Sequence, residues 1–328
     1  MRRRTVLVAI HVLGVLLFFV AERAFADTER NRKALDEFKR VVSLRYIYKD
    51  YKSVHWSSLY AKHEYRILGS QTNAEFAANL NELVRELRDP HFRVAARSGQ
   101  FLPNDSRIPK VNYNLEAIPQ IVENLTELND FISIGQVDKV GYIMIKSWSQ
   151  GDPAAYRVLA TELLQKLFKD TSGLIIDVRM NPGGVIQNAE AFARRFASQR
   201  LLAAYRHSLD QRGNLVKREY YLEGEREDYS KSVIVLMGNM SVSATEYFIL
   251  QMQTIPRVRT MGDHSGGMTG MPLGYRLSNG VVIAVPSVAL MDLRNTYIEE
   301  YGIRPDASDN VLIHALKKLG AKFTPGQS

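Results

Sequence analysis

The later part of the chain alternates short apolar runs with amphipathic segments, and this alternation constrains the fold most. The runs "KVGYIMIKSW", "GLIIDVR", "SVIVLM" and "GVVIAVPSVAL" have the length and β-branched content of buried strands. Segments with helical periodicity, such as 152–169 and 185–198, lie between them. Strands that alternate with such helices predict an α/β layer architecture with a largely parallel sheet. We assign this core domain to residues 139–328.

The first 26 residues have the pattern of a secretory signal peptide. A basic start, "MRRR", precedes an apolar run of about 17 residues, and "AFA" places small residues just before Asp27. An apolar run of this length is close to the minimum for a membrane-spanning helix, so a retained anchor is the alternative. We therefore expect an exported protein, periplasmic or extracellular, with loose membrane association if the leader is retained.

Residues 27–90 are predicted to form a helical N-terminal domain. Towards its end, in "NAEFAANLNELVREL", apolar residues recur at spacings of three and four, which is one face of a helix. Asn73 is the expected cap of this helix. The helix should end before Pro90, which disfavours helical geometry at the preceding residue, so His91 is expected on a turn. Residues 91–138, which contain several prolines, are predicted to be a connecting segment.

Composition and missing motifs exclude several classes of function. The chain of 328 residues contains no cysteine, which rules out thiolate catalysis and cysteine metal sites. Its net charge of +8 is dispersed and no nucleic-acid motif is present, so we expect no nucleic-acid partner. The loop "GGMTG" does not contain the lysine of a P-loop, and no H-E-x-x-H or EF-hand pattern occurs. We therefore predict neither a metal nor a cofactor.

Ser243 stands where the strand "SVIVLM" gives way to a helix. The segment "SATE" fits a capping box, so a purely structural cap is the main alternative to a chemical role. A serine at a helix N-terminus, after a buried strand, also lies where open α/β sheets place their ligands. Free N–H groups at such a terminus favour an oxyanion. We interpret Ser243 as both a cap and a candidate nucleophile, and Ser241 as a loop residue.

The turn "RMNPGG" ends the preceding buried strand. Pro-Gly is typical of an ordinary tight turn, but a Gly-Gly pair also leaves N–H groups approachable. Two such turns on neighbouring strands would place a nucleophile opposite an oxyanion hole.

A serine hydroxyl also needs a base. Local context favours His91 and His264 as candidates for this base, and their spacing in the sequence alone does not distinguish between them.

Four separated motifs resemble one family, the tail-specific or C-terminal-processing serine peptidases. They are "LIIDVRMNPGG", "VIVLMGNMSVSATEYF", "TMGDHSGG" and "EEYGIRPD", in this order over roughly 139–318. The helical start followed by "LRDPHF" is similar to the tricorn-like and retinoid-binding-protein-like branch. The resemblance implies a crotonase/ClpP-like layered α/β core with a helical N-terminal domain. About 50 residues separate His91 from the first core strand, which is short for the PDZ domain that many members carry, so we expect none.

The resemblance also implies site residues. The family nucleophile falls on Ser243, and the oxyanion N–H groups fall on Ala244 and on Gly183 or Gly184. The Ser–Lys branch of the family places a lysine where this chain has Met268.

The other branch of the family uses the histidine of a D-x-H element, which falls on His91. Its acidic partner falls on Glu299, with Glu300 as the competitor. The implied function is an exported serine peptidase that cleaves polypeptides by a Ser–His–Glu mechanism. The alternative is a non-catalytic protein that binds peptides or apolar ligands on the same fold. A histidine base with an ordinary pKa would give activity that rises through about pH 6 to 7.

Overall fold

The computed structural model describes residues 27–97, 100–104, 107, 109–225, 229–308 and 311–322. The predicted leader, residues 1–26, lies outside them. No helix in these ranges is both long and apolar enough to cross a bilayer. The chain divides into two compact units. Of the described residues, unit 1 contains those up to Arg107 with Leu209–Leu215 and Met271–Ser287, and unit 2 contains the others.

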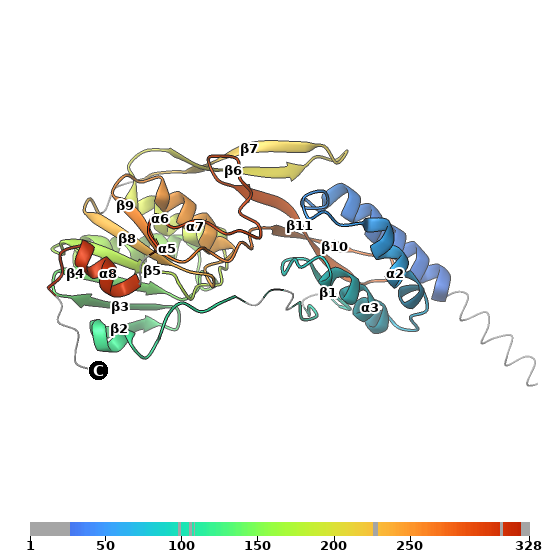
Figure 1. Cartoon of the computed structure of the whole chain (residues 1–328), viewed down its shortest axis with the longest axis horizontal. Coiled ribbons are helices and arrows are strands. Elements are labelled where there is room, and N and C mark those ends of the chain that lie inside the picture. The colour runs from blue at the N-terminus through green and yellow to red at the C-terminus, as the bar shows by residue number, and fades with distance from the viewer. Residues whose placement is uncertain are drawn as a thin grey trace, which may run out of the picture. The chain divides into compact units, whose positions relative to one another are not determined.

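Unit 1 contains the predicted helical region (Figure 1). Its helices are the one over residues 27–45, α2 (Trp56–Leu68) and α3 (Asn73–Arg85). The predicted cap of α3 is wrong by one residue. The Thr72 hydroxyl accepts the Glu75 N–H, and Asn73 is the first helical residue. Asn73 instead donates its side-chain amide to the Asn279 carbonyl at 2.5 Å. A turn follows α3 and contains His91, as predicted.

Strands from two distant parts of the sequence complete unit 1. β1 (Arg93–Ala95) pairs antiparallel with the first part of β11 (Val282–Met291), with Val94 opposite Ile283, and β10 (Met271–Arg276) also pairs with β11. Buried aromatic rings fill the core of the unit, and the ring of Phe92 lies 5.3 Å from that of Tyr46 between centroids. The return of the chain at 271–287 is a long-range pairing that local sequence patterns do not reveal.

Unit 2 is built on a six-stranded sheet in the order β2-β3-β4-β5-β8-β9. The parallel strands are β4 (Val140–Ile145), β5 (Gly173–Asp177), β8 (Ser232–Met237) and β9 (Val258–Gly262). The antiparallel hairpin of β2 (Glu123–Asn129) and β3 (Ile132–Val137) extends this sheet at the β4 side. The predicted α/β fold class is confirmed, and the hairpin comes from the segment predicted as a connection.

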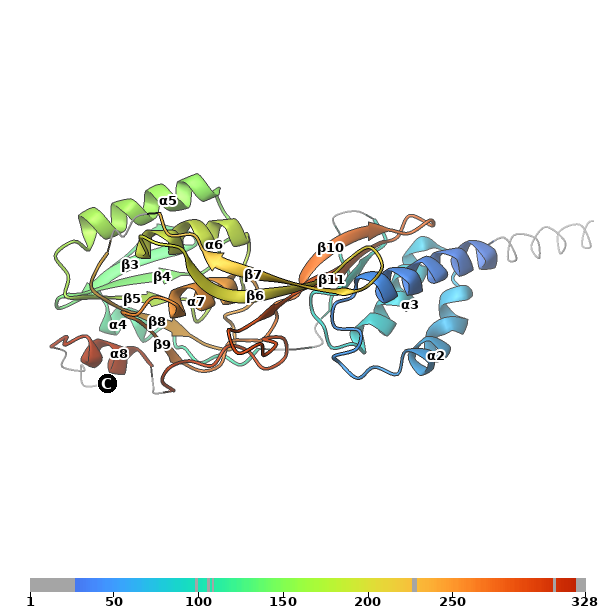
Figure 2. The same cartoon turned by 90° about the horizontal axis from the view of Figure 1, so that it is seen from above.

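Helices cover both faces of this sheet (Figure 2). One face packs against α5 (Pro153–Glu162), its π-helical continuation Leu163–Leu167, α6 (Ile186–Ala193), its 3-10 continuation Arg194–Phe196, and α7 (Ala244–Gln253). The other packs against α4 (Ile118–Ile121) and α8 (Val311–Lys318). Along β4, Ile143 and Ile145 belong to the first cluster and Tyr142 and Met144 to the second. Burial on both faces explains the continuous apolar runs.

A second group of strands in unit 2 was not predicted. β6 (Leu201–Leu209) pairs with β7 (Leu215–Leu222) and, antiparallel, with the last part of β11, where Arg206 lies opposite Leu290. Most residues of β7 are exposed or half-buried. A strand with so little buried surface has a weak apolar pattern, which is why sequence periodicity did not identify it.

Candidate active site

The segments that follow three neighbouring parallel strands meet at one edge of the unit 2 sheet. β4, β5 and β8 lead into 146–151, 178–184 and 238–243. The Trp148 N–H donates to the Gly183 carbonyl at 2.9 Å, which joins the first two segments. Because carboxyl ends of parallel strands share an edge, open α/β sheets bind their ligands there.

Ser243 ends the third of these segments in a strained backbone conformation. Its φ of 57° and ψ of −123° lie in a region that residues other than glycine rarely adopt. The predicted capping box with Glu246 is present. The Ser243 N–H donates to Glu246 Oε2 at 3.0 Å and to the Met268 carbonyl at 3.1 Å. The serine is therefore fixed at the start of α7 through its backbone.

The Glu246 carboxylate is the buried centre of this arrangement. Its Oε2 also accepts the Met268 N–H at 3.0 Å, and its Oε1 accepts the Ser265 hydroxyl at 2.6 Å and the Gly267 N–H at 2.8 Å. Burial raises the pKa of Glu246 to about 7, and these hydrogen bonds oppose the shift. Sequence reasoning assigned Glu246 only to the cap. Its second role, in fixing the glycine loop 265–268, depends on a long-range contact.

The "NPGG" turn lies directly against Ser243. Gly183 has a φ of 98°, and a Cβ added there would lie 2.8 Å from the Ser243 Cβ and 3.0 Å from the Ala244 nitrogen. The Gly183 N–H donates to Asn181 Oδ1 at 2.9 Å. Within the described ranges, by contrast, no hydrogen bond uses the N–H of Gly184 or of Ala244. Of the two predicted glycines, Gly184 is therefore the one whose N–H is available to a ligand.

Glu299 and Glu300 differ sharply in their surroundings. Glu299 is fully buried and its Oε2 accepts the Thr269 N–H at 3.0 Å, whereas the Glu300 side chain is exposed. Ser243 and Glu299 thus bond to adjacent residues of one loop, Met268 and Thr269. A buried carboxylate must be held by donors, and the Thr269 N–H is one such donor to Glu299.

His91 lies in unit 1, on the turn after α3. Its backbone N–H donates to Asp89 Oδ1 at 3.1 Å, and the buried Asp89 carboxylate also accepts the Tyr46 hydroxyl at 3.0 Å. Burial lowers the pKa of His91 to about 4; Arg93, Arg107 and Lys52 also lower it, while Asp89 opposes them. The imidazole is therefore neutral near pH 7, which is the form a general base requires.

The other candidates lie in the glycine loop of unit 2. His264 is exposed, and its Nδ1 lies 3.3 Å from the Tyr301 carbonyl, to which it can donate. Met268, at the position of the lysine in the Ser–Lys branch, is buried and bonds to Ser243 and Glu246 through its backbone. In the part of the chain that the structure describes, no three histidine or acidic side chains cluster as a metal site would require.

Comparison with known proteins identifies the family. The peptidase family S41 matches residues 139–308, just over half of the chain. The chain belongs to peptidase family S41. The tricorn protease C1 domain matches residues 27–85, in the helical region of unit 1. The resemblance inferred from the four sequence motifs is therefore confirmed.

Two curated relatives are processing proteases of bacteria. The carboxyl-terminal-processing protease of Synechocystis is 25% identical over 202 residues, covering 58% of this chain and 45% of its own. The carboxy-terminal processing protease CtpB of Bacillus subtilis is 26% identical over 170 residues, covering 52% of this chain and 34% of its own. The chain thus spans less than half the length of these two relatives.

A solved structure from Parabacteroides merdae shares the fold. It superposes with a TM-score of 0.73 at 24% identity, covering 91% of this chain and 99% of that one.

Proposed function

We propose that the chain is an exported serine peptidase that cleaves polypeptides by a Ser–His–Glu mechanism. Membership of family S41 and the names of the curated relatives support peptide-bond hydrolysis. One observation carries the proposal furthest: Ser243 is held at a positive φ against Gly183, and among the described residues no hydrogen bond uses the N–H of Ala244 or of Gly184, the next residue of the turn. Export rests on the signal-peptide pattern of residues 1–26.

In this mechanism Ser243 Oγ attacks the scissile carbonyl carbon while the neutral His91 imidazole accepts the hydroxyl proton. The carbonyl oxygen becomes an oxyanion that accepts the N–H groups of Gly184 and Ala244, each worth about 3 kcal/mol of barrier lowering. As the C–N bond breaks, His91 returns the proton to the leaving amine. Water, activated in the same way, then hydrolyses the acyl-serine.

Two assignments in this scheme rest on different support. His91 is assigned as the base by the "LRDPHF" motif, and its lowered pKa leaves the ring in the neutral form that can accept a proton. Glu299 is assigned as the acidic partner because its carboxylate is buried, whereas that of Glu300 is exposed. A buried carboxylate would fix the imidazole tautomer and stabilise the imidazolium.

A serine-reactive probe tests the proposal. We expect a fluorophosphonate to label the folded chain once, with the adduct mapped to Ser243 by mass spectrometry, and to leave the denatured chain unlabelled. Nucleophilicity depends on the assembled base and oxyanion site, so labelling should require the fold. Absence of labelling together with saturable peptide binding would instead identify a non-catalytic binder on this fold.

The pH profile of peptidase activity should depend on the lowered pKa of His91. Its pKa is lowered to about 4, so the imidazole stays neutral down to that pH. We expect kcat/KM for a peptide substrate to rise as the pH increases through about 4, rather than through 6 to 7 as an ordinary histidine implies. His264→Gln should leave this acidic limb of the pH profile unchanged. A limb at pH 6 to 7 would show that a carboxylate such as Glu299 raises the pKa of the ring in the working enzyme, and activity only in alkaline solution would contradict a histidine base and point to a lysine.

Adding one methyl group at Gly183 should disturb both the turn and the serine. A Cβ there would meet Ser243 Cβ at 2.8 Å, Val242 O at 2.9 Å and Ala244 N at 3.0 Å, at a φ that alanine rarely adopts. We expect Gly183→Ala to lower the free energy of unfolding by about 1–3 kcal/mol and to slow labelling at least tenfold. Gly274→Ala, with nothing within 4 Å of the added atom, is the control. Equal effects in both variants would show that the Gly183 contact is unimportant.

A further inference from the structure

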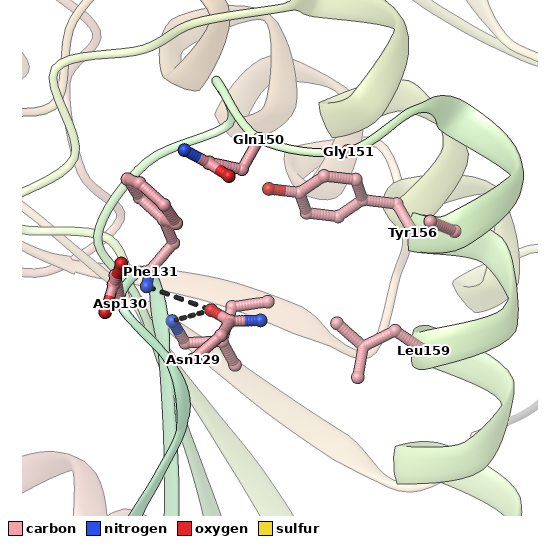
Figure 3. A pocket seen from close by; sticks show the side chains of 9 residues that line it. Asn129, Asp130, Phe131, Gln150, Gly151, Tyr156 and Leu159 are labelled. Atoms are coloured by element: carbon pink, nitrogen blue, oxygen red, sulfur yellow. Dashed lines mark hydrogen bonds between the residues drawn. The ribbon is translucent and has the colours of Figure 1, made fainter.

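A cavity of about 360 Å³ opens in unit 2 beyond the end of β4 (Figure 3). Its walls come from the β2–β3 turn, from the loop that follows β4, and from the first turns of α5. The residues that shape it are Phe131, Gln150, Gly151, Ala155, Tyr156 and Leu159. Figure 3 shows the Phe131 ring on one side and the Tyr156 ring and the Leu159 side chain on the other. The walls are therefore mainly apolar.

The loop that lines this cavity also contacts the oxyanion turn. Trp148 donates its N–H to the Gly183 carbonyl at 2.9 Å, and a Cβ added at Gly184 would lie 2.6 Å from the Ser149 nitrogen. The next two residues, Gln150 and Gly151, line the cavity. A chain whose carbonyl oxygen accepts the Gly184 N–H would thus lie beside the loop that forms one wall.

Hydrogen bonds hold this loop in one conformation. The Asn188 Nδ2 on α6 donates to the Trp148 carbonyl at 2.9 Å and lies 3.3 Å from the carbonyl oxygens of Gln150 and Gly151. The Tyr156 hydroxyl donates to the Ser147 carbonyl at 3.1 Å. Because these polar groups bond to the loop, the Tyr156 ring remains as an apolar wall, and the cavity is preformed.

Charge further restricts the occupant. Of the nine described residues that line the cavity, Asp130 is the one that carries a formal charge at pH 7. The side-chain oxygen of Asn129 already accepts the N–H groups of Phe131 and Ile132, each at 2.9 Å. The cavity therefore offers mainly apolar surface, with the side-chain amides of Asn129 and Gln150 and the carboxylate of Asp130, and the carboxylate disfavours acidic side chains.

We propose that this cavity is a specificity pocket that receives one large apolar side chain of the polypeptide substrate, such as leucine, methionine or phenylalanine. The inference rests on the proposed peptidase function, and it assigns substrate choice to the walls of α5 and of the β2–β3 turn. Burying such a side chain favours substrates that carry it at one fixed position relative to the cleaved bond.

Neighbouring alanines on α5 provide a matched test. Ala155 lines the cavity and Ala154 does not, and both side chains are exposed. Wild type, Ala155→Phe and Ala154→Phe are each incubated with a complex peptide mixture, and cleavage sites are read by mass spectrometry. Wild type should enrich large apolar residues at one position. Ala155→Phe should lower kcat/KM for those peptides about 10- to 100-fold and favour alanine or glycine there, while Ala154→Phe should match wild type.

Fluorophosphonate labelling of Ser243 and thermal unfolding are measured on the same samples. The pocket is supported if both variants keep labelling and folding and the cleavage profile shifts in Ala155→Phe alone. Retained labelling with three identical profiles overturns the pocket and leaves the peptidase proposal intact. If wild type shows neither labelling nor cleavage, the proposed function fails, and the role of the cavity in substrate choice fails with it.

Discussion

Ser243→Ala is expected to lower turnover of casein or a peptide substrate by about 10⁵- to 10⁶-fold, the scale of loss when a serine nucleophile is removed. The fold should tolerate the change. The bonds from residue 243 to Glu246 and Met268 use its backbone N–H, which alanine retains. We therefore expect the free energy of unfolding to change by about 1 kcal/mol or less, the usual cost of an N-cap serine. Initial rates and denaturant melts measure the two quantities.

Ser241 provides the opposite control two residues away. Its buried hydroxyl donates to the Val178 carbonyl at 2.7 Å and accepts the Gly238 N–H at 3.1 Å. Ser241→Ala should therefore lower the free energy of unfolding by about 1–3 kcal/mol and still permit labelling of Ser243. Equal turnover by wild type and Ser243→Ala would remove Ser243 from the mechanism.

Glu246→Gln is expected to damage both stability and activity. The carboxylate accepts four hydrogen bonds, and a glutamine amide would direct a donor towards N–H groups such as that of Gly267 or Met268. We expect a loss of about 2–5 kcal/mol in the free energy of unfolding. Labelling of Ser243 should slow as well, because the same carboxylate fixes its backbone. The exposed Glu300 provides the control, and Glu300→Gln should leave stability within about 0.5 kcal/mol of wild type.

The effect of Glu246→Gln should depend on pH. Burial raises the pKa of Glu246 to about 7 from an ordinary 4.5, so the folded state binds a proton that the unfolded state releases between these values. The stabilisation from this proton is fully present below about pH 4.5 and is lost as the pH rises through about 7. The stability difference between wild type and Glu246→Gln should therefore be largest in acid. A difference that does not change between pH 4.5 and 8 would contradict the raised pKa.

The parts of the candidate site that could be predicted from the sequence are those that depend on neighbouring residues. Ser243, the "NPGG" turn and the box with Glu246 follow from short-range rules for strand ends, tight turns and helix caps. The bond from the Gly183 N–H to Asn181 Oδ1 is also local, since it spans two residues, but the turn residues alone did not predict it. The cavity beside Gln150 was not predicted either, since three separate segments form its walls.

Periodicity, turn residues and local motifs were sufficient to predict the alternation of strands and helices in the core, the helical start, the turn that carries His91 and the family. Long-range contacts, by contrast, account for the way Glu246 fixes the glycine loop, for the burial of Glu299 beside the exposed Glu300, and for the pairing of β11 with β1. The physical reason is that burial and hydrogen-bond partnership are set by residues far apart in the chain. No local pattern of apolar and polar residues specifies which distant donor, acceptor or strand a residue will meet.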